Sequence, residues 1–282
     1  MKRGTLFVLS TPIGHLGDFS FRGLETLRRV AVVAAEDTRR TRRLLAHYGV
    51  ACELVSLHAH SAPAAIERLL DRVEAGEDAA YATDAGTPGV SDPGAALATR
   101  AHERGLAVVP VPGPAAVTAA LAATGFPADR FVFAGFLPRK GTGRADLLRR
   151  IAAEEWTVVC YEAPNRTAAL LADLAAACGA DRPAAVAREL TKLHEEVRRG
   201  TVGELAQYYQ EQPPRGEVTV VVGGAVAPAA AGARAPAAAD LDEGRRLAAA
   251  LRADGGSPAA IAKELAQRLG ISRHDAYRLL NR

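Results

Sequence analysis

The sequence predicts an α/β protein in which parallel strands are covered by helices. In residues 4–112, short apolar runs alternate with stretches of helical periodicity, which is typical of parallel strands buried on both faces. The predicted strands are residues 5–9, 31–34, 53–57, 79–82 and 107–111. A helix between the third and fourth strands is indicated by apolar residues that share one face, among them Ile66, Leu70 and Val73.

A second α/β block begins near Phe131. Its predicted strands are residues 157–161, 184–187 and 218–222, with helices at residues 144–155 and 166–178. Gly125 and Pro127 mark the connector between the blocks, because both residue types interrupt regular structure. We therefore expect an N-terminal α/β domain over residues 1–125, which carries the ligand loops, and a second α/β domain over residues 126–224.

The remaining chain is expected to hold a linker and a small helical domain. Residues 225–239 consist mainly of Ala, Gly and Pro, a composition that cannot bury a core and predicts a linker. Residues 240–282 are predicted to be helical: Ser257 caps a helix with Pro258 at its first position, Gly270 ends it, and Ser272 can cap the next. This spacing is similar to a helix-turn-helix, and the alternative is a helical hairpin that packs on the main body or on a partner. The eight basic and six acidic residues of this tail attract DNA weakly, so no DNA partner is expected.

The composition is that of a packed globular protein, and 282 residues suffice for two or three compact units. The formal net charge of +3 permits a polyanionic partner without requiring one. Cys52, Cys160 and Cys178 are few and lack C-x-x-C spacing, which argues against a disulfide framework and a zinc site and fits a reducing cytosol. The chain start shows no signal-peptide pattern, and no uncharged apolar stretch approaches the length of a spanning helix. We expect a cytoplasmic protein without a membrane partner.

Four loops at the expected carboxyl edge of the first sheet have unusual sequences. They follow the first, second, fourth and fifth strands and comprise residues 10–18, 36–39, 83–94 and 110–116. Ligands of doubly wound sheets collect at this edge, and the Gly and Pro residues let a rigid backbone approach a ligand closely. Neither G-x-G-x-x-G nor G-x-x-x-x-G-K-[ST] follows a predicted strand, which disfavours dehydrogenases, kinases and GTPases. A ligand with an adenosine and a zwitterionic tail but no phosphates suits these loops better.

Short motifs in these loops and beyond them resemble a known family. They are T-P-I-G at 11–14, E-D-T-R at 36–39, D-A-G-T-P at 84–88 with S-D-P-G at 91–94, P-G-P at 112–114, G-F-L-P at 135–138, Y-E-A-P-N-R at 161–166 and A-R-E-L-T-K at 187–192. This ordered set resembles the ribosomal RNA small subunit methyltransferase I family. His15, Thr83, Ala163 and Asn165 depart from the usual Asn, Ser, Ser and His of that family. The porphyrin-acting relatives usually carry G-x-G-P-G-D and G-D-P loops instead, so the RNA branch is favoured.

The resemblance implies a two-domain tetrapyrrole-methylase-like fold, that of a class III methyltransferase, with a small helical C-terminal domain. It also implies S-adenosylmethionine in the cleft between the two α/β domains, and a homodimer. The implied reaction is 2′-O-methylation of a cytidine in the decoding region of 16S ribosomal RNA. The implied partner is that RNA or the assembled small ribosomal subunit.

Catalysis of this reaction needs a group that takes the proton of the ribose hydroxyl. Candidate bases are Glu36, Asp37, His58, Glu162 and Glu189, and the family motif adds Lys192 beside Glu189. We retain Glu36, Asp37, Glu189 and Lys192 as the catalytic set. The alternatives are that Asp37 only caps a helix over residues 38–47, and that Glu189 and Lys192 form a helical ion pair. His58 and His60 are interpreted as surface residues.

Cofactor binding is assigned to residues of the four loops and one tyrosine of the second block. These residues are Pro12, Leu16, Asp84, Ala85, Gly86, Val90, Ala115, Ala116 and Tyr161. Asp84 can bind the ligand or only hold its own loop. Two basic clusters are candidates for RNA phosphates, namely Arg39 and Arg40 with their neighbours Arg42 and Arg43, and Arg139, Lys140 and Arg144. Solvated surface charge is the alternative for each cluster.

Two other functions stay open at this stage. One is C- or N-methylation of a small tetrapyrrole-like substrate on the same fold. The other is a non-catalytic protein that binds RNA or assists ribosome assembly, although four tight loops around one pocket argue against it.

Overall fold

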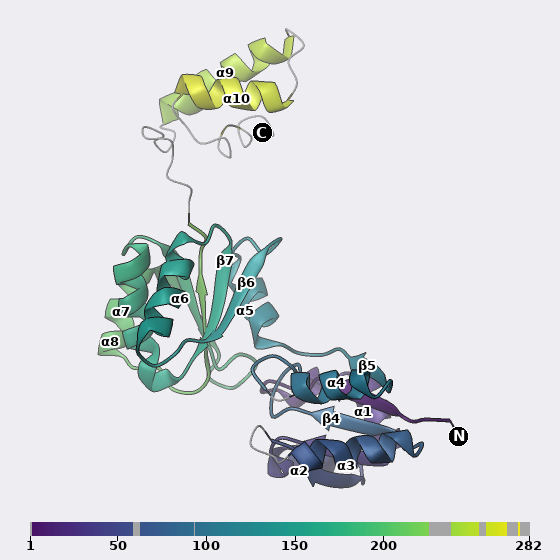
Figure 1. Cartoon of the computed structure of the whole chain (residues 1–282). Helices are drawn as coiled ribbons and strands as arrows, with labels where there is room; N and C mark the ends of the chain where they lie inside the picture. The colour runs from purple at the N-terminus through teal and green to yellow at the C-terminus, as the bar shows by residue number, and fades with distance from the viewer. Residues whose placement is uncertain are drawn as a thin grey trace. The chain divides into compact units, whose positions relative to one another are not determined.

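The computed structural model describes residues 2–58, 63–92, 94–225, 238–253, 258–269 and 276 (Figure 1). The chain forms two compact units, Met1–Ala225 and Val226–Arg282. The larger unit contains two five-stranded sheets, and the smaller one contains helices. Among the described residues, no helix has the length and apolar character needed to cross a membrane.

The first sheet is entirely parallel. Its strands are β1 (Thr5–Leu9), β2 (Val32–Ala35), β3 (Glu53–Ser56), β4 (Ala79–Ala82) and β5 (Ala107–Val111), in the spatial order β3-β2-β4-β1-β5. Every residue of β2 and β4 is buried, as the apolar runs predicted for strands covered on both faces. The predicted α/β class with parallel strands is confirmed.

Helices cover both faces of this sheet. They are α1 (Phe21–Arg29), α2 (Thr38–His47), α3 (Pro63–Glu74) and α4 (Gly94–Glu103), with a short 3-10 turn at Leu16–Asp18. Leu27, Leu44 and Leu45 of α1 and α2 enter one core cluster. Leu69, Leu70 and Leu97 of α3 and α4 enter the other. The two clusters hold opposite side chains of the same strands, because side chains alternate along a strand.

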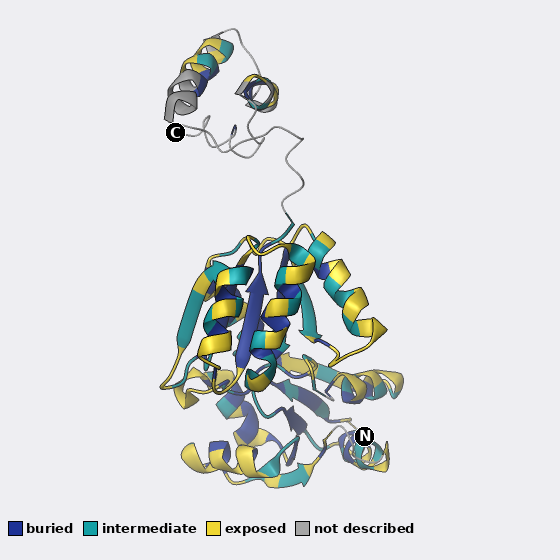
Figure 2. Cartoon of the chain, turned by 90° about the vertical axis from the view of Figure 1, so that its left-hand side faces the viewer, coloured by how far each residue is buried: buried dark blue, intermediate teal, exposed yellow. Residues whose placement is uncertain are grey.

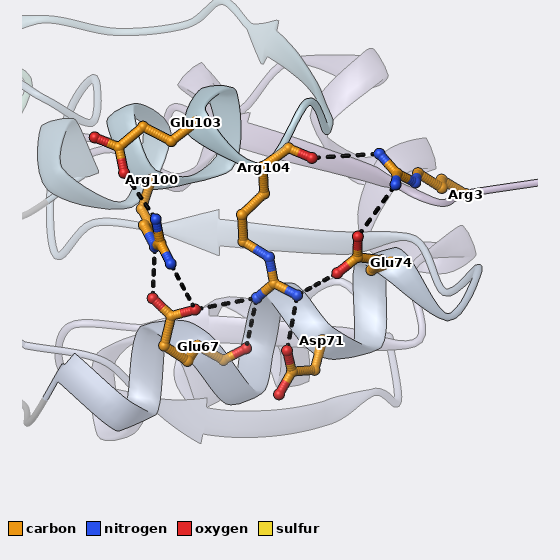
Figure 3. Close-up of polar contacts among 7 residues, drawn as sticks. All are labelled: Arg3, Glu67, Asp71, Glu74, Arg100, Glu103 and Arg104. Carbon is orange, nitrogen blue, oxygen red and sulfur yellow. Dashed lines mark hydrogen bonds and ion pairs between the residues drawn. The ribbon is translucent and has the colours of Figure 1, made fainter.

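An ion network joins α3 and the end of α4 to Arg3 near the start of the chain (Figure 3). The Arg104 guanidinium lies at its centre and pairs with Glu67, Asp71 and Glu74. Arg100 lies in α4, which ends one residue before Arg104, and also pairs with Glu67. This hydrogen bond, followed by weaker charge effects, holds the pKa of Glu67 below its ordinary value. Because the Arg104 side chain is only 15% exposed, this network is better shielded than a surface pair and connects the two helices firmly.

The second sheet is mixed. Its strands are β6 (Phe131–Phe136), β7 (Thr157–Glu162), β8 (Pro183–Arg188), β9 (Glu196–Thr201) and β10 (Val218–Val222), in the order β6-β7-β10-β8-β9. β6 runs parallel to β7, whereas β10 is antiparallel to β7 and β8, and β9 is antiparallel to β8. The sequence did not predict β9, because its residues E-V-R-R-G-T are mostly polar, as is typical of an edge strand.

Helices also cover the second sheet on both faces, and Figure 2 shows its buried strands between exposed helical surfaces. One face carries α6 (Thr142–Ala153), α7 (Thr167–Cys178) and α8 (Val202–Glu211), and a 3-10 turn at Pro164–Arg166 precedes α7. The other face carries α5 (Ala116–Thr124), whose Val117, Ala120 and Leu121 pack on it. Thus α5 precedes Gly125, where the sequence suggested a boundary, and yet it packs on the second sheet. The chain crosses between the sheets before Ala116.

The smaller unit contains α9 (Ala238–Ala253) and α10 (Pro258–Leu269). Ala248 of α9 packs with Ile261, Ala262 and Leu265 of α10 in a small core. α10 begins at Pro258, the residue predicted for its first position. Most of the predicted linker, the predicted cap Ser257, the terminator Gly270, the helix expected after Ser272 and the surface residue His60 lie outside the described residues.

Candidate functional site

A cleft of about 430 Å³ lies where loops from both sheets of the larger unit converge. The first sheet contributes residues that follow its strands, and the second contributes the ends of β6 and β7 and the start of β10. The lining residues are Ile13, Glu36, Arg40, Thr83–Thr87, Val90–Asp92, Ala115, Ala116, Phe136, Tyr161–Pro164 and Gly216–Thr219. The cleft therefore lies at the edge that the loop sequences predicted.

The loops that follow β1, β2, β4 and β5 hold one another in place. Thr11 and Gly86 exchange two backbone hydrogen bonds of 2.9 and 3.0 Å, which joins the first loop to the third. The backbone N–H of Asp37 donates to Asp84 Oδ1 at 2.8 Å, and Thr87 Oγ1 donates to the Pro114 carbonyl at 3.0 Å. Asp84 both lines the cleft and fastens the β2 loop, so the two roles considered for it are compatible.

Glu36 is a carboxylate at the cleft with few partners of its own. It follows β2, is half-buried and lines the cleft. Its Oε2 accepts a hydrogen bond of 3.2 Å from Thr83 Oγ1, and within the described ranges no cation pairs with it. The side chain therefore keeps acceptor capacity for a ligand in the cleft.

Asp37 lies beside Glu36 but does not line the cleft. It caps α2 by accepting the Arg39 N–H at 2.9 Å, and its carboxylate binds the Arg39 guanidinium through both oxygens. These side-chain and backbone hydrogen bonds from Arg39 hold the pKa of Asp37 well below its ordinary value. Asp37 thus has the geometry of a helix cap, which was the alternative to a catalytic role for it.

Two aromatic rings form part of the wall that the second sheet contributes. Tyr161 lies 5.4 Å from Phe136 between ring centroids, and 4.9 Å from the more deeply placed Phe133. Phe136 is 53% exposed, an unusual solvent contact for a large apolar ring, and it lines the cleft. Such a wall suits a planar ring of a ligand.

The charge of the lining residues is negative. Glu36, Asp84, Asp92, Glu162 and Glu217 line the cleft, against the single guanidinium of Arg40. Arg40 pairs with Asp84 at 3.8 Å, and Glu162 pairs with Arg166 behind the wall. Burial and then the charges of Asp92, Glu36 and Asp84 raise the pKa of the Tyr81 hydroxyl beneath the loop. A cationic ligand suits this wall, and a phosphate group does not.

Glu162 is the most deeply buried of these carboxylates. Its side chain is 1% exposed, and its Oε1 accepts the Ala163 N–H at 2.8 Å and pairs with Arg166. Its Oε2 has no hydrogen-bond partner among the described residues. The contacts with Arg166 and Ala163 connect the end of β7 to the turn before α7, so Glu162 holds the wall in place.

The structure distributes the predicted cofactor residues unevenly. Seven of them line the cleft, namely Asp84, Ala85, Gly86, Val90, Ala115, Ala116 and Tyr161. Pro12 and Leu16 do not line it. Leu16 is 37% exposed, and its carbonyl accepts a hydrogen bond of 2.5 Å from the Tyr48 hydroxyl.

The predicted catalytic pair Glu189 and Lys192 lies next to the cleft but does not line it. Lys192 Nζ donates to Glu189 Oε1 at 2.9 Å and to Glu217 Oε2 at 3.0 Å, and Glu217 lines the cleft. The helical alternative for this pair is wrong, because Glu189 and Thr191 have φ of 50° and 65°, which a right-handed helix excludes.

The predicted RNA-binding cations occupy different environments. Arg40 lines the cleft, while the Arg39 side chain is 83% exposed and carries the Asp37 pair. Arg139 and Lys140 are exposed ahead of α6. Arg144 is only 13% exposed and donates to Asp173 at 2.6 Å and to the Pro138 carbonyl at 3.0 Å, so its guanidinium serves the fold.

Sequence reasoning missed part of the wall. Thr87, Ser91, Asp92 and Phe136 stand within or beside recognised motifs, but Gly216–Thr219 does not follow a predicted parallel strand. That segment reaches the cleft because β10 is antiparallel, so that the start of β10 lies at the edge where the parallel strands end. The P-P-R-G-E sequence before β10 is the signal that could have indicated a ligand loop.

Two other cavities receive none of the loops that follow β1, β2, β4 and β5. One of about 310 Å³ lies between β9, α8 and residues 212–215, and one of about 420 Å³ lies between the β2–β3 edge and α3. The convergence of loops from both sheets makes the cleft the candidate functional site.

The fold and the cleft together define a two-domain α/β protein of the methylase type, and similarity to known proteins agrees. A sequence profile of the family described as Tetrapyrrole (Corrin/Porphyrin) Methylases matches residues 5–206. A uroporphyrin-III C-methyltransferase from Thermus thermophilus, solved in complex with S-adenyl homocysteine, superimposes with a TM-score of 0.57 at 18% identity. That comparison covers 78% of this chain and 97% of the other.

Curated relatives define the group more narrowly. Ribosomal RNA small subunit methyltransferase I of Xylella fastidiosa is 44% identical over 276 residues, which is 97% of this chain and 98% of the relative. The protein of that name from Synechocystis is 45% identical over 79% of this chain and 80% of the relative. The chain belongs to the tetrapyrrole methylase family and, within it, to the ribosomal RNA small subunit methyltransferase I family. The family resemblance and the two-domain fold expected from the sequence are confirmed.

Proposed function

We propose that the protein transfers a methyl group from S-adenosylmethionine to the 2′-hydroxyl of a cytidine ribose in the decoding region of small-subunit ribosomal RNA. The observation that carries the proposal is the acidic, aromatic-walled cleft built by the motif loops in a chain of this family. The named relatives support ribosomal RNA as the substrate. The cytidine and the ribose oxygen come from the family resemblance.

The residues present fit S-adenosylmethionine. The cofactor carries a sulfonium and an ammonium, and carboxylates outnumber the guanidinium in the wall. Asp84, Ala85, Gly86, Val90, Ala115, Ala116 and Tyr161 would hold it directly. Pro12 and Leu16 would act through the shape of the loop that Thr11 joins to Gly86. When bound, the cofactor supplies an activated methyl group.

We assign proton removal to Glu36. The Glu36 carboxylate would accept the proton of the ribose hydroxyl as its oxygen takes the methyl group that bound S-adenosylmethionine would supply. The Thr83 hydroxyl, at 3.2 Å, orients that carboxylate, and no described cation competes for it. Asp37 and Glu189, by contrast, are engaged by Arg39 and Lys192. A positioned base of this kind contributes roughly 10²- to 10⁴-fold to the rate.

RNA would be held at the rim of the cleft. The acidic wall repels phosphates, so the phosphate contacts fall to the exposed Arg39, Arg139 and Lys140 and to Arg40 at the mouth. Arg144 would support them by holding the Pro138 carbonyl ahead of α6. We expect the protein to be cytoplasmic and to form a homodimer. Sedimentation of the purified protein tests the dimer.

The test uses S-adenosylmethionine with a labelled methyl group. The protein is incubated with isolated small ribosomal subunits, with free 16S ribosomal RNA, and with tetrapyrrole precursors. Label in a cytidine ribose of the RNA is the expected result. If only the tetrapyrrole precursors are labelled, the substrate is a tetrapyrrole and the proposed RNA methylation is wrong. If the protein binds ribosomal subunits but transfers no label, a role in ribosome assembly is favoured instead.

A further inference from the structure

The turn that joins β8 to β9 has an unusual backbone. Among the described residues, three non-glycine residues have positive φ: Ser91, Glu189 and Thr191, at 68°, 50° and 65°. Two of these three lie in the turn Glu189–Lys192, and Ser91 lines the cleft. A left-handed non-glycine residue is strained and persists only where its surroundings hold it. The contacts of the turn therefore indicate what holds it.

On one side, the turn holds the segment Gly216–Thr219. The Glu189 N–H donates to the Glu217 carbonyl, and the Glu217 N–H donates back to Glu189 Oε1, both at 2.9 Å. Lys192 Nζ bridges the Glu189 and Glu217 carboxylates. Gly216 has φ of 81°, and a Cβ there would lie 2.1 Å from the Glu189 carboxyl group. The turn and this wall of the cleft thus fit without spare volume.

On the other side, the turn grips the loop that follows β1 of the first sheet. The His15 N–H donates to Thr191 Oγ1 at 3.0 Å. A Cβ on Gly14 would lie 2.4 Å from Lys192 Cγ and 2.7 Å from Thr191 Oγ1, so the two backbones approach closely. Leu190 packs in one core cluster with Ile13, which lines the cleft. One four-residue turn therefore contacts a wall of the cleft from each sheet.

We propose that the turn Glu189–Lys192 is a positioning element, which sets the separation of the two walls of the cleft for the cofactor. Thr191 holds the Ile13–Gly14–His15 side, and the Glu189–Lys192 pair holds the Gly216–Thr219 side. The proposal rests on the proposed binding of S-adenosylmethionine in this cleft. It gives the A-R-E-L-T-K motif a role other than the chemical step.

Geometry separates positioning from catalysis here. Glu189 and Lys192 pair with each other, Glu189 Oε1 also accepts the Glu217 N–H, and Lys192 also pairs with the Glu217 carboxylate. Neither residue lines the cleft. Burial alone would raise the pKa of Glu189, but the hydrogen bonds from Lys192 and the Glu217 N–H outweigh it and lower the pKa. A carboxylate held anionic by a lysine and a backbone N–H is a poor proton acceptor and a good clamp.

The test compares Thr191→Gly with Thr191→Ser in the full chain. Glycine adopts positive φ without strain, so Thr191→Gly keeps or raises stability while it removes the contact with His15. Serine retains the hydroxyl. We expect calorimetry to show S-adenosylmethionine affinity about 5-fold weaker for the Gly variant, the effect of one lost hydrogen bond, and unchanged within about 2-fold for the Ser variant. Thermal unfolding without cofactor should show the Gly variant at least as stable as the wild type.

Stability and affinity thus move in opposite directions, which a purely structural role for the turn does not produce. Wild-type affinity for the Gly variant overturns the proposal, as does an equal loss for both variants. If the wild-type protein itself shows no S-adenosylmethionine binding, the proposed function fails and not the positioning role alone. Glu189→Gln provides a second check: its amide oxygen still accepts the Glu217 N–H, and loss of the Lys192 charge pair should weaken cofactor affinity about 3-fold.

Discussion

The two sheets meet at the same cleft but reach it in different ways. Every strand of the first sheet runs in the same direction, so the loops after its strands open on one edge. The second sheet is mixed and contributes two strand ends, one strand start and a strained turn. The first sheet supplies the polar loops of the site, and the second supplies the aromatic wall and the clamp. A parallel sheet thus concentrates its ligand loops by topology, whereas a mixed sheet needs specific contacts to do so.

The largest expected effect is on the rate of methyl transfer, and it tests whether the first sheet has the chemical role while the second shapes the cleft. Glu36→Gln removes the proposed proton acceptor while keeping its shape, so kcat should fall about 10²- to 10³-fold. Calorimetric affinity for S-adenosylmethionine should change far less. Single-turnover methylation of small subunits measures the rate. If Asp37→Asn shows the greater loss, the base is Asp37 and the assignment of Glu36 is wrong.

The second prediction concerns the clamp on the other wall. Gly216→Ala places a Cβ against the Glu189 carboxyl group at a residue with φ of 81°, so both strain and a clash should oppose folding. We expect a loss of about 3 kcal/mol in the free energy of unfolding, measured in urea. Gly179→Ala is the matched control, because its φ is 89° and its Cβ would meet nothing within 4 Å. Equal losses in both variants would mean that the contact with Glu189 contributes nothing.

The third prediction compares exposed with engaged cations. Arg139→Ala combined with Lys140→Ala should lower RNA affinity and reduce the slope of log affinity against log salt by about 2, which is one per lost phosphate contact. Arg144→Ala should instead lower the stability of the second sheet, because it breaks the contact with Asp173 and Pro138. RNA-binding titrations over a range of salt concentrations measure the slope. A larger slope change in Arg144→Ala would place the phosphate site at that residue.

The smallest effect is a pH dependence of the clamp. The pKa of Glu189 is lowered on folding, so its stabilising contribution is present above the ordinary value of 4.5 and is lost as pH falls through the folded pKa. The difference in unfolding free energy between the wild type and Glu189→Gln should therefore be constant near neutral pH and shrink in acid. Urea denaturation of both proteins across this range measures it. A difference that grows in acid would contradict the assigned sign.

Much of the first sheet could be predicted, because burial on both faces makes each strand an apolar run. β1, β4 and β5 have the predicted bounds, and β2 and β3 differ from them by a residue. The loops of the site were recognisable because their Gly and Pro residues follow those runs. Seven of the nine predicted cofactor residues line the cleft.

The second sheet was harder to predict. The edge strand β9 is polar, and the direction of β10 depends on its neighbours in space, which the apolar run V-T-V-V-V does not encode. The sequence of α5, A-V-T-A-A-L-A-A-T, is apolar on most faces and does not specify which sheet it packs on, so the boundary expected at residue 125 left its contact with the second sheet unforeseen.

The sequence by itself determined the α/β class, the family and the loops around the site, because these depend on local runs, turn residues and the order of motifs. Only the tertiary structure decided which carboxylates face the cleft. Glu36 and Asp37 are adjacent in sequence, yet one lines the cleft and the other caps a helix. Glu189 and Lys192 resembled catalytic residues in sequence, and the left-handed turn places them behind the wall as a clamp. The physical reason is that side-chain direction and partner choice depend on packing between distant segments, which residue type and spacing do not fix.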